Sequence, residues 1–236
     1  MPRTRGLVLA LTRCNSAAHA AEWETWYDET HLPDLVRDGG PWVATRWRLP
    51  EAPVPGRPSI GFTHVAIYEL DDSDLDACAR RLRERDRALR RRGRVHPAHC
   101  VLGVELLRAH GKFSEKAAPS PALRGHILAW VMCNQPEREA EWDAWYEARH
   151  APDMLECRAF SGLTRWRRQH RTTVGPQHLT LYDVAGTPVA EAVERSFAVL
   201  PRIRAAGHWL DCHAGGLAFS LEPAGSHGAA GYHRPG

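Results

Sequence analysis

The chain has 236 residues, of which 43% are hydrophobic and 25% charged, and its formal net charge is +3. This composition is typical of a globular protein, and so small a charge does not indicate nucleic-acid binding. No apolar run approaches the roughly 20 residues of a membrane helix, and residues 1–11 lack a signal-peptide pattern. Six cysteines without a Cys-x-x-Cys motif favour reduced thiols. We therefore expect a cytoplasmic protein with no membrane or nucleic-acid partner.

The first half of the chain predicts the order β-α-β-β-α-β. Residues 7–14, 42–49, 62–70 and 95–109 have strand patterns. A tryptophan-rich helix follows the first strand and should end at Pro33, because proline disfavours the α conformation of the residue before it. The sequence Asp71-Asp72-Ser73 should cap a second helix that runs to about Arg92. Four prolines between residues 50 and 58 predict a loop.

The second half repeats this order. Residues 111–123 are predicted to be a linker, and strands are expected at 126–133, 163–169, 178–184 and 208–221. Another tryptophan-rich helix follows the first of these strands, and a helix over 189–205 should be kinked by Pro201. Residues 222–236 should be a disordered tail. The expected domains are thus 1–110 and 124–221.

A long internal repeat supports this division. The segment from Glu22 to Asp34 reappears as Glu141 to Asp153, at a constant offset of 119 residues that extends in both directions. Each half is then a ferredoxin-like β-α-β-β-α-β repeat, with both helices on one face of a four-stranded sheet. Two bare sheet faces can cover each other. The predicted fold is therefore α+β, with the repeats packed sheet to sheet as an intramolecular dimeric α+β barrel whose interior could hold a ligand.

The repeated helix suggests an acid/base group. His31 should lie near the helix end, where the helix dipole favours a protonated imidazole, and Asp34 could accept its N–H. His150 and Asp153 stand in the same relation. The alternative is a buried structural histidine that caps the last turn. The acidic residues between the helix aromatics, including Asp28, are expected to point mostly to water.

Two arginines could stabilise negative charge on a substrate. Arg46 and Arg165 each precede a tryptophan on a strand, so alternation sends Arg and Trp to opposite faces. If the tryptophans pack under the helices, the arginines point into the barrel and could bind a carboxylate or enolate oxygen. If the arrangement is reversed, they form structural ion pairs. The sequence leaves both arrangements open.

Further side chains are secondary candidates for substrate contacts. They recur in both repeats: Tyr27 and Tyr146, His64 with Tyr68, His178 with Tyr182, and His96 and His208. The tyrosines of the helices fit a core position better than a ligand contact, and the strand pairs also fit a wet strand edge. His96 and His208 each precede a cysteine by four residues, about 13 Å along a strand, which is too far to share one zinc ion. No metal site is predicted.

Two further patterns bear on nucleic-acid binding and on nucleotide cofactors. The arginine run over residues 80–94 lacks interleaved aromatic residues, so it fits a solvated helix face better than a nucleic-acid site. No glycine-rich phosphate-binding motif follows a strand. A nucleotide-dependent reaction is therefore not expected.

The motif Trp-x-x-Trp-Tyr-x-x-x-His-x-Pro-Asp, followed by a strand with an Arg-Trp pair, resembles the EthD-like branch of the dimeric α+β barrel superfamily. The resemblance covers nearly the whole chain as a fused pseudo-dimer. It rests on Trp26-Tyr27, His31, Pro33 and Arg46-Trp47, and on Trp145-Tyr146, His150, Pro152 and Arg165-Trp166. The glycine usual before the second strand is only loosely matched by Gly39-Gly40-Pro41 and Ser161-Gly162.

This resemblance implies relatives that include methylmuconolactone isomerases, polyketide cyclases, pigment-pathway dehydratases and cofactor-free monooxygenases; more distant members bind haem. In the isomerases a histidine at the helix end transfers protons, a role that carries onto His31 and His150. We thus expect a cofactor-free enzyme that isomerises, cyclises or dehydrates a hydrophobic oxygenated substrate, as a monomer or homodimer. The alternatives are a cofactor-free or haem-dependent monooxygenase and a non-catalytic binding protein.

Overall fold

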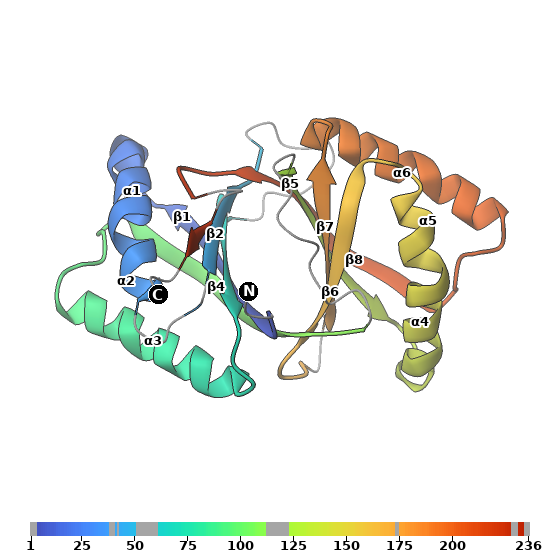
Figure 1. Cartoon of the computed structure of the whole chain (residues 1–236), viewed down its shortest axis with the longest axis horizontal. Helices are drawn as coiled ribbons and strands as arrows, with labels where there is room; N and C mark the ends of the chain where they lie inside the picture. The colour runs from blue at the N-terminus through green and yellow to red at the C-terminus, as the bar shows by residue number, and fades with distance from the viewer. Residues whose placement is uncertain are drawn as a thin grey trace. The chain divides into compact units, whose positions relative to one another are not determined.

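The computed structural model describes residues 4–37, 41, 43–50, 61–111, 123–172, 175–227 and 231–233. The chain divides into two compact units (Figure 1). The first comprises residues 1–108 and 222–236, and the second residues 109–221. Within the described part, no helix is long and apolar enough to cross a membrane.

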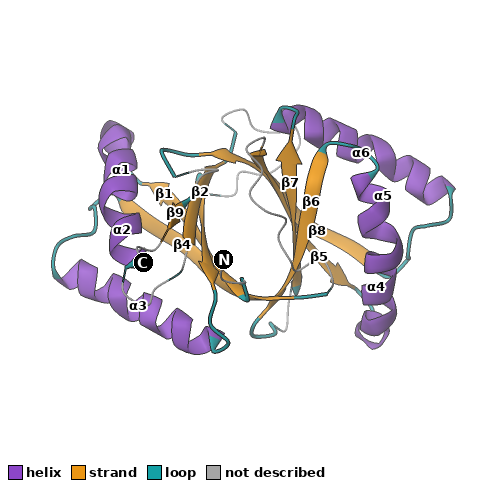
Figure 2. Cartoon of the chain, in the orientation of Figure 1, coloured by secondary structure: helices purple, strands orange, loops and turns teal. Residues whose placement is uncertain are grey.

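The first unit contains an antiparallel sheet in the order β4-β1-β3-β2. Its helices lie together against one face of this sheet (Figure 2). The strands are β1 (Gly6–Cys14), β2 (Val43–Arg48), β3 (His64–Leu70) and β4 (His99–Ala109). The helices are α1 (Ala20–Trp26), α2 (Leu32–Val36) and α3 (Leu75–Arg91), preceded by the short 3-10 turn η1 (Ala17–His19). This is the predicted ferredoxin-like order.

The second unit repeats this topology with the sheet order β8-β5-β7-β6. Its strands are β5 (Leu123–Cys133), β6 (Phe160–Arg168), β7 (His178–Ala185) and β8 (His213–Pro223). Its helices are α4 (Glu139–Trp145), α5 (Ala151–Leu155) and α6 (Val189–Ala205), after the 3-10 turn η4 (Pro136–Arg138). The expected linker lies largely outside the described residues, and its last residue, Leu123, already begins β5.

The tryptophan-rich helix does not end at its proline, which corrects the prediction. A wider π-helical turn, η2 (Tyr27–His31), joins α1 to α2, and the amide of Leu32 donates to the carbonyl oxygen of Tyr27, five residues back. Pro33 occupies the first turn of α2, where its missing N–H leaves no α-helical bond broken. The second repeat has the same turn as η5 (Tyr146–His150). His31 is therefore inside a continuing helix, away from any helix end.

The last strand of each unit begins later than predicted. β4 starts at His99 and β8 at His213, because a turn precedes each strand: the amide of His99 donates to His96 O, and that of His213 donates to Leu210 O. These residues lie outside the ladder, so the approach to each last strand is irregular.

The structural correspondence of these segments differs from the predicted one. Trp26 Nε1 donates to Arg94 O at 2.8 Å, and Trp145 Nε1 donates to His208 O at 2.6 Å. His208 therefore corresponds to Arg94, an offset of 114 residues, and the predicted pairing of His208 with His96 is wrong.

The helix α3 begins later than predicted, whereas α6 has the predicted bounds. The N-cap of α3 is Asp74, whose Oδ1 accepts from Ala77 N at 2.8 Å, rather than the preceding Asp71-Asp72-Ser73. Pro201 lies within α6, which continues through it to Ala205.

The C-terminal segment is part of the first unit, contrary to the expected disordered tail. β8 extends to Pro223 and pairs there with β2, and a short strand, β9 (Tyr232–His233), also pairs with β2. Asp28 Oδ2 accepts hydrogen bonds from the amide of Ser226 at 2.6 Å and from its hydroxyl at 2.9 Å. The described part of this segment, residues 222–227 and 231–233, thus satisfies a buried carboxylate and pairs with the edge of β2.

We expect Ser226→Ala to lower the unfolding free energy of the protein by about 1 kcal/mol, because it removes a hydrogen bond to a carboxylate. Urea denaturation measures this change. Ser161→Ala is the matched control, since the Ser161 hydroxyl is exposed and donates to the Asp183 carbonyl at 3.3 Å. Equal effects of the two substitutions would show that the Ser226 hydroxyl does not stabilise the first unit.

A candidate active site between the helices and the sheet

The first unit contains a cavity of about 270 Å³ on the helix-covered face of its sheet. Apolar side chains from β1, α2, α3 and β4 form much of its wall, namely Val8, Ala10, Leu35, Leu82, Val101 and Val104. The sequence placed the ligand space on the opposite face, inside the barrel. This cavity lies on the other face, under the helices of the first unit, where Tyr27 and His31 contribute to its lining.

Two histidines line this cavity. His31 comes from the π-helical turn and His99 from the start of β4, and their ring centroids are 5.1 Å apart. Trp23 Nε1 donates to His99 Nδ1 at 3.2 Å. Because the indole N–H can only donate, Nδ1 accepts and the proton of the neutral ring is on Nε2. His31 Nδ1 and His99 Nε2 are buried and have no hydrogen-bond partner among the described residues.

Burial keeps both imidazoles neutral. It lowers the pKa of His31 well below its usual value and that of His99 to about 4. The sequence predicted the opposite direction for His31, from the dipole at a helix end. That prediction fails because the helix continues beyond His31 and the ring is only 4% exposed.

Phenols lie beside the histidines, and charges lie at the mouth. The hydroxyls of Tyr27 and Tyr68 are 3.4 Å apart at the cavity wall, and burial raises both pKa values, so both are neutral phenols. The helix α3 contributes four charged side chains, which are Arg83, Asp86, Arg87 and Arg90. The arginine run therefore forms a solvated face, as predicted, and also part of the cavity wall.

The arginines of the Arg-Trp motif are structural. Arg46 is fully buried under the helix, where it pairs with Glu24 at 2.5 Å and with Asp28 at 3.0 Å. Its guanidinium lies 4.8 Å from the ring of Trp23 and 4.3 Å from that of Tyr27. Of the two arrangements left open by the sequence, the ion-pair arrangement is observed. Asp28 is buried for this reason, although it was expected to point to water.

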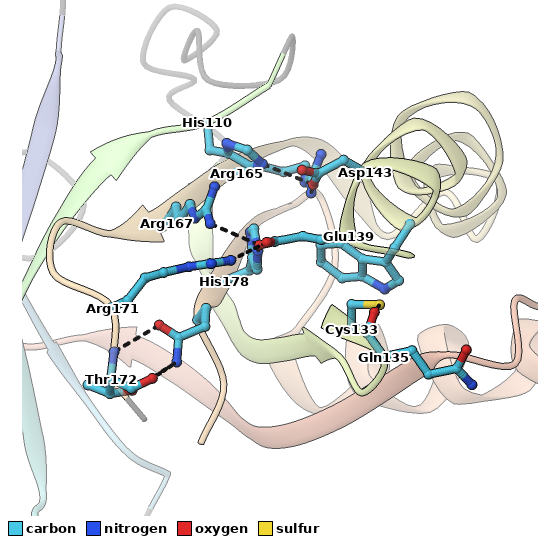
Figure 3. A network of polar contacts seen from close by, with 12 residues as sticks. His110, Cys133, Gln135, Glu139, Asp143, Arg165, Arg167, Arg171, Thr172 and His178 are labelled. Atoms are coloured by element: carbon cyan, nitrogen blue, oxygen red, sulfur yellow. Dashed lines mark hydrogen bonds and ion pairs between the residues drawn. The ribbon is translucent and has the colours of Figure 1, made fainter. Parts of the chain in front are cut away.

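Arg165 makes the corresponding contacts in the second unit. It pairs with Asp143 at 2.7 Å and with Glu147 at 3.4 Å, and lies 4.3 Å over the ring of Tyr146. Figure 3 shows Arg165 and Asp143 together with His110, whose Nε2 is 2.9 Å from Asp143 Oδ1. Neither motif arginine is among the residues that line the described cavity.

The predicted pairing of each helix histidine with the aspartate three residues later is wrong. Asp34 accepts from Arg94 Nε at 2.7 Å, and Asp153 pairs with His208 Nδ1 at 3.0 Å. His150 Nδ1, like that of His31, is buried without a partner among the described residues. The additional helical turn after the histidine directs each aspartate to the segment before the last strand.

The strand pairs face the helices, so they do not form a wet strand edge. His64 Nε2 lies 3.0 Å from Glu24, and Tyr68 contacts Tyr27. In the second unit His178 Nε2 lies 3.0 Å from Glu139 Oε1. His96, the remaining candidate, lies 3.6 Å from Glu22.

The histidine site of the second unit is more closely packed. Tyr146 OH is 2.7 Å from Thr180 Oγ1 and 3.1 Å from Tyr182 OH, so this hydroxyl already has two hydrogen-bond partners. Trp209 packs edge to face against both His150 and His213, at ring distances of 6.1 and 5.0 Å. The position that corresponds to Trp209 in the first unit is the smaller Val95. The first unit is therefore the better candidate for a substrate site.

His99 and its counterpart His213 were not singled out by sequence reasoning. Trp142 Nε1 donates to His213 Nδ1 at 3.1 Å, as Trp23 does to His99. A signal for this pair is present: Gly93 and Gly207 end the second helix of each repeat with φ of 66° and 71°. Aligning these two glycines gives the offset of 114 residues that matches His99 with His213.

We expect acid to destabilise the fold through these histidines. Burial lowers the folded-state pKa to about 4 for His99, His178 and His213, and to about 3 for His150. The unfolded chain, with histidine pKa values near 6.5, therefore binds more protons, and stability is lost as the pH falls from about 6.5 toward 4. Urea denaturation at pH 7.5, 6 and 5 measures this loss. A stability independent of pH over this range would contradict it.

No protein-family model and no curated protein sequence matches the chain. Solved structures of similar fold include DypB from Rhodococcus jostii RHA1 in complex with heme, with a TM-score of 0.60, 8% identity, and coverage of 95% of this chain and 94% of that one. A chlorite dismutase from Candidatus Nitrospira defluvii gives a TM-score of 0.55 at 10% identity, covering 94% and 93%. An anthrone oxidase-like protein gives 0.51 at 13% identity, covering 94% and 92%. The fold class is thus that of the ferredoxin-like α+β barrel proteins, as predicted.

The residues around His31 do not fit a haem, although one of these similar structures contains heme. Rings of Trp26, Tyr27 and His99 lie 4.7, 4.8 and 5.1 Å from the imidazole of His31. The cavity of about 270 Å³ is below the roughly 300–1,000 Å³ of pockets for drug-sized ligands. An axial ligand needs a ring nitrogen that faces space for a macrocycle, and His31 lacks that space.

Proposed function

We propose that the first unit is an enzyme that transfers a proton on a small, hydrophobic, oxygenated molecule without a cofactor. The observation that supports this most directly is the cavity with two neutral imidazoles, His31 and His99, whose ring centroids are 5.1 Å apart. One ring nitrogen of each is buried and has no partner among the described residues. Such atoms are costly to bury unless a ligand group bonds to them.

The two rings suit different roles. His99 carries its proton on Nε2, so it can donate a hydrogen bond to a carbonyl or phenol oxygen as negative charge develops there. His31 is the general base and later the acid. A base whose pKa is lowered removes only an acidic proton. The reactive group is therefore a phenol or a C–H next to a carbonyl.

The cavity walls suggest the size and polarity of the substrate. The volume suits a molecule of one or two rings, and the largely apolar wall favours a hydrocarbon body. Arg83, Arg87 and Arg90 on α3 would attract a carboxylate or phenolate at the mouth. Isomerisation, cyclisation and dehydration of such a molecule all begin with this proton transfer.

The EthD-like motif of both repeats supports a duplicated, fused pair in which one site retains activity. On this proposal the first repeat carries the active site, while the second has become a packed structural copy around His150. Six cysteines that are all free are consistent with a cytoplasmic enzyme.

The test compares metabolites of a deletion strain with those of strains complemented by wild type, His31→Gln or His150→Gln. We expect a small oxygenated compound to accumulate in the deletion strain, and only His31→Gln to fail to remove it. A binding protein would give normal product levels with both variants. An oxygenase would consume dioxygen when the purified protein is given the accumulated compound, whereas the proposed enzyme would not.

A further inference from the structure

A cluster of three side chains that could bind a metal ion lies in the second unit, within the network of Figure 3. His110 follows β4, Asp143 is on α4 and His178 begins β7. One ligating atom of each lies within 4.8 Å of those of the other two. The fold therefore brings two imidazoles and a carboxylate together from three separate segments.

His178 has a nitrogen that nothing in its described surroundings uses. Its Nε2 lies 3.0 Å from Glu139 Oε1, and Arg167 and Arg171 also pair with Glu139. A carboxylate held by two guanidinium groups is ionised and can only accept, so His178 Nε2 carries the proton. The lone pair is then on Nδ1, which is buried and without a partner among the described residues. A carboxylate on the far nitrogen is the usual second-shell partner of a metal-bound histidine.

The other two ligands have a separation that suits a metal ion. His110 Nε2 is 2.9 Å from Asp143 Oδ1. If an ion lay about 2.1 Å from both of these atoms, the angle between its two bonds would be about 90°, which is the octahedral value. Two histidines and one carboxylate leave coordination positions open for water.

We propose that His110, Asp143 and His178 bind a divalent first-row transition-metal ion. The ion would replace the proton between His110 and Asp143 and would join the segment after β4 to α4 and β7. The proposal does not depend on the activity assigned to the first unit.

The positive charge of Arg165 disfavours a metal ion next to Asp143 but does not exclude one. Its guanidinium is 2.7 Å from Asp143 Oδ1. A carboxylate has two oxygens and about four acceptor positions, so Asp143 can hold Arg165 and the ion together. Glu139 and Glu147 add further negative charge around the cluster, opposite Arg167 and Arg165.

The first unit provides an internal control. His64, at the position of His178, pairs with Glu24, which also pairs with Arg46. Within the described residues, no further imidazole joins this group to form a three-ligand cluster. His64→Gln therefore removes a similar histidine without touching the proposed site.

The experiment uses the full-length protein, treated with a chelator and then dialysed against Co²⁺, with bound cobalt measured per chain by mass spectrometry. We expect one tightly bound ion in wild type and in His64→Gln. His178→Gln and His110→Gln should lose it, and Glu139→Gln should bind about 10–100-fold more weakly because the second-shell partner of His178 is weakened.

The circular dichroism spectrum shows whether each variant is folded, and His110→Gln is the variant best able to fold, because the His110 side chain is 19% exposed and that of His178 only 3%. Wild type that binds no cobalt would overturn the proposal. Cobalt binding that is the same in wild type and folded His110→Gln would also overturn it.

Discussion

Replacing His31 by glutamine should lower kcat by about 10²–10⁴-fold, the usual contribution of a positioned general base. The substitution keeps a polar side chain of similar size in the cavity but removes the titratable nitrogen. Turnover of the compound that accumulates in the deletion strain, followed with purified protein, measures the effect. The unfolding free energy of the same preparation shows whether the fold is intact.

The matched control is His150→Gln, which makes the same change in the more closely packed second unit. We expect kcat to stay close to wild type, because Trp209 covers that ring and the Tyr146 hydroxyl is already bonded to Thr180. Loss of turnover in His150→Gln alone would move the active site to the second unit. Equal turnover in both variants and in wild type would exclude His31 and His150 as the base.

The second large effect concerns stability. Arg46→Met should lower the unfolding free energy by about 3–5 kcal/mol, because it removes the cation of a buried ion-pair network and leaves carboxylates without compensation. Asp28 is 7% exposed and would lose its cationic partner. Urea denaturation followed by tryptophan fluorescence measures the loss of unfolding free energy. A variant that no longer folds at 25 °C would correspond to the largest loss in the expected range.

Arg48→Met is the control on the same strand. The Arg48 side chain is 48% exposed, and its nearest carboxylate, Glu222, is 3.7 Å away, so its loss should cost less than about 1 kcal/mol. Arg46→Lys should fall between the two, since lysine keeps the charge but cannot form two directed bonds from a planar fork. If Arg46→Met costs no more than Arg48→Met, the buried network does not stabilise the first unit.

The features that the sequence predicted well rest on local periodicity and on duplication. The helix α3 follows an apolar pattern of 3.6 residues, β1 and β3 are short, largely apolar runs, and the structure places all three near the expected bounds. The repeat of Trp23 to Asp34 was enough to predict two ferredoxin-like units. Such patterns depend on neighbours in the chain, so one sequence is sufficient to read them.

Side-chain partners could not be predicted because they depend on segments that are distant in the chain. Asp34 is near His31 in sequence, yet it pairs with Arg94, because the π-helical turn carries the helix past Pro33. The burial of Arg46 also depends on which face of β2 the helices cover. Residue alternation allows either face, and only packing selects one.

By itself, the sequence determined the duplication, the α+β class, the order of strands and helices and the place of a histidine in each tryptophan-rich helix. The tertiary structure decided that the cavity lies between helices and sheet, that His99 is the companion of His31, and that the motif arginines hold the helices in place. The physical reason is the cost of burying charged and polar groups without partners. His99 of β4 accepts a hydrogen bond from Trp23 and Ser226 of the C-terminal segment donates to Asp28, and only folding brings those segments to the helix.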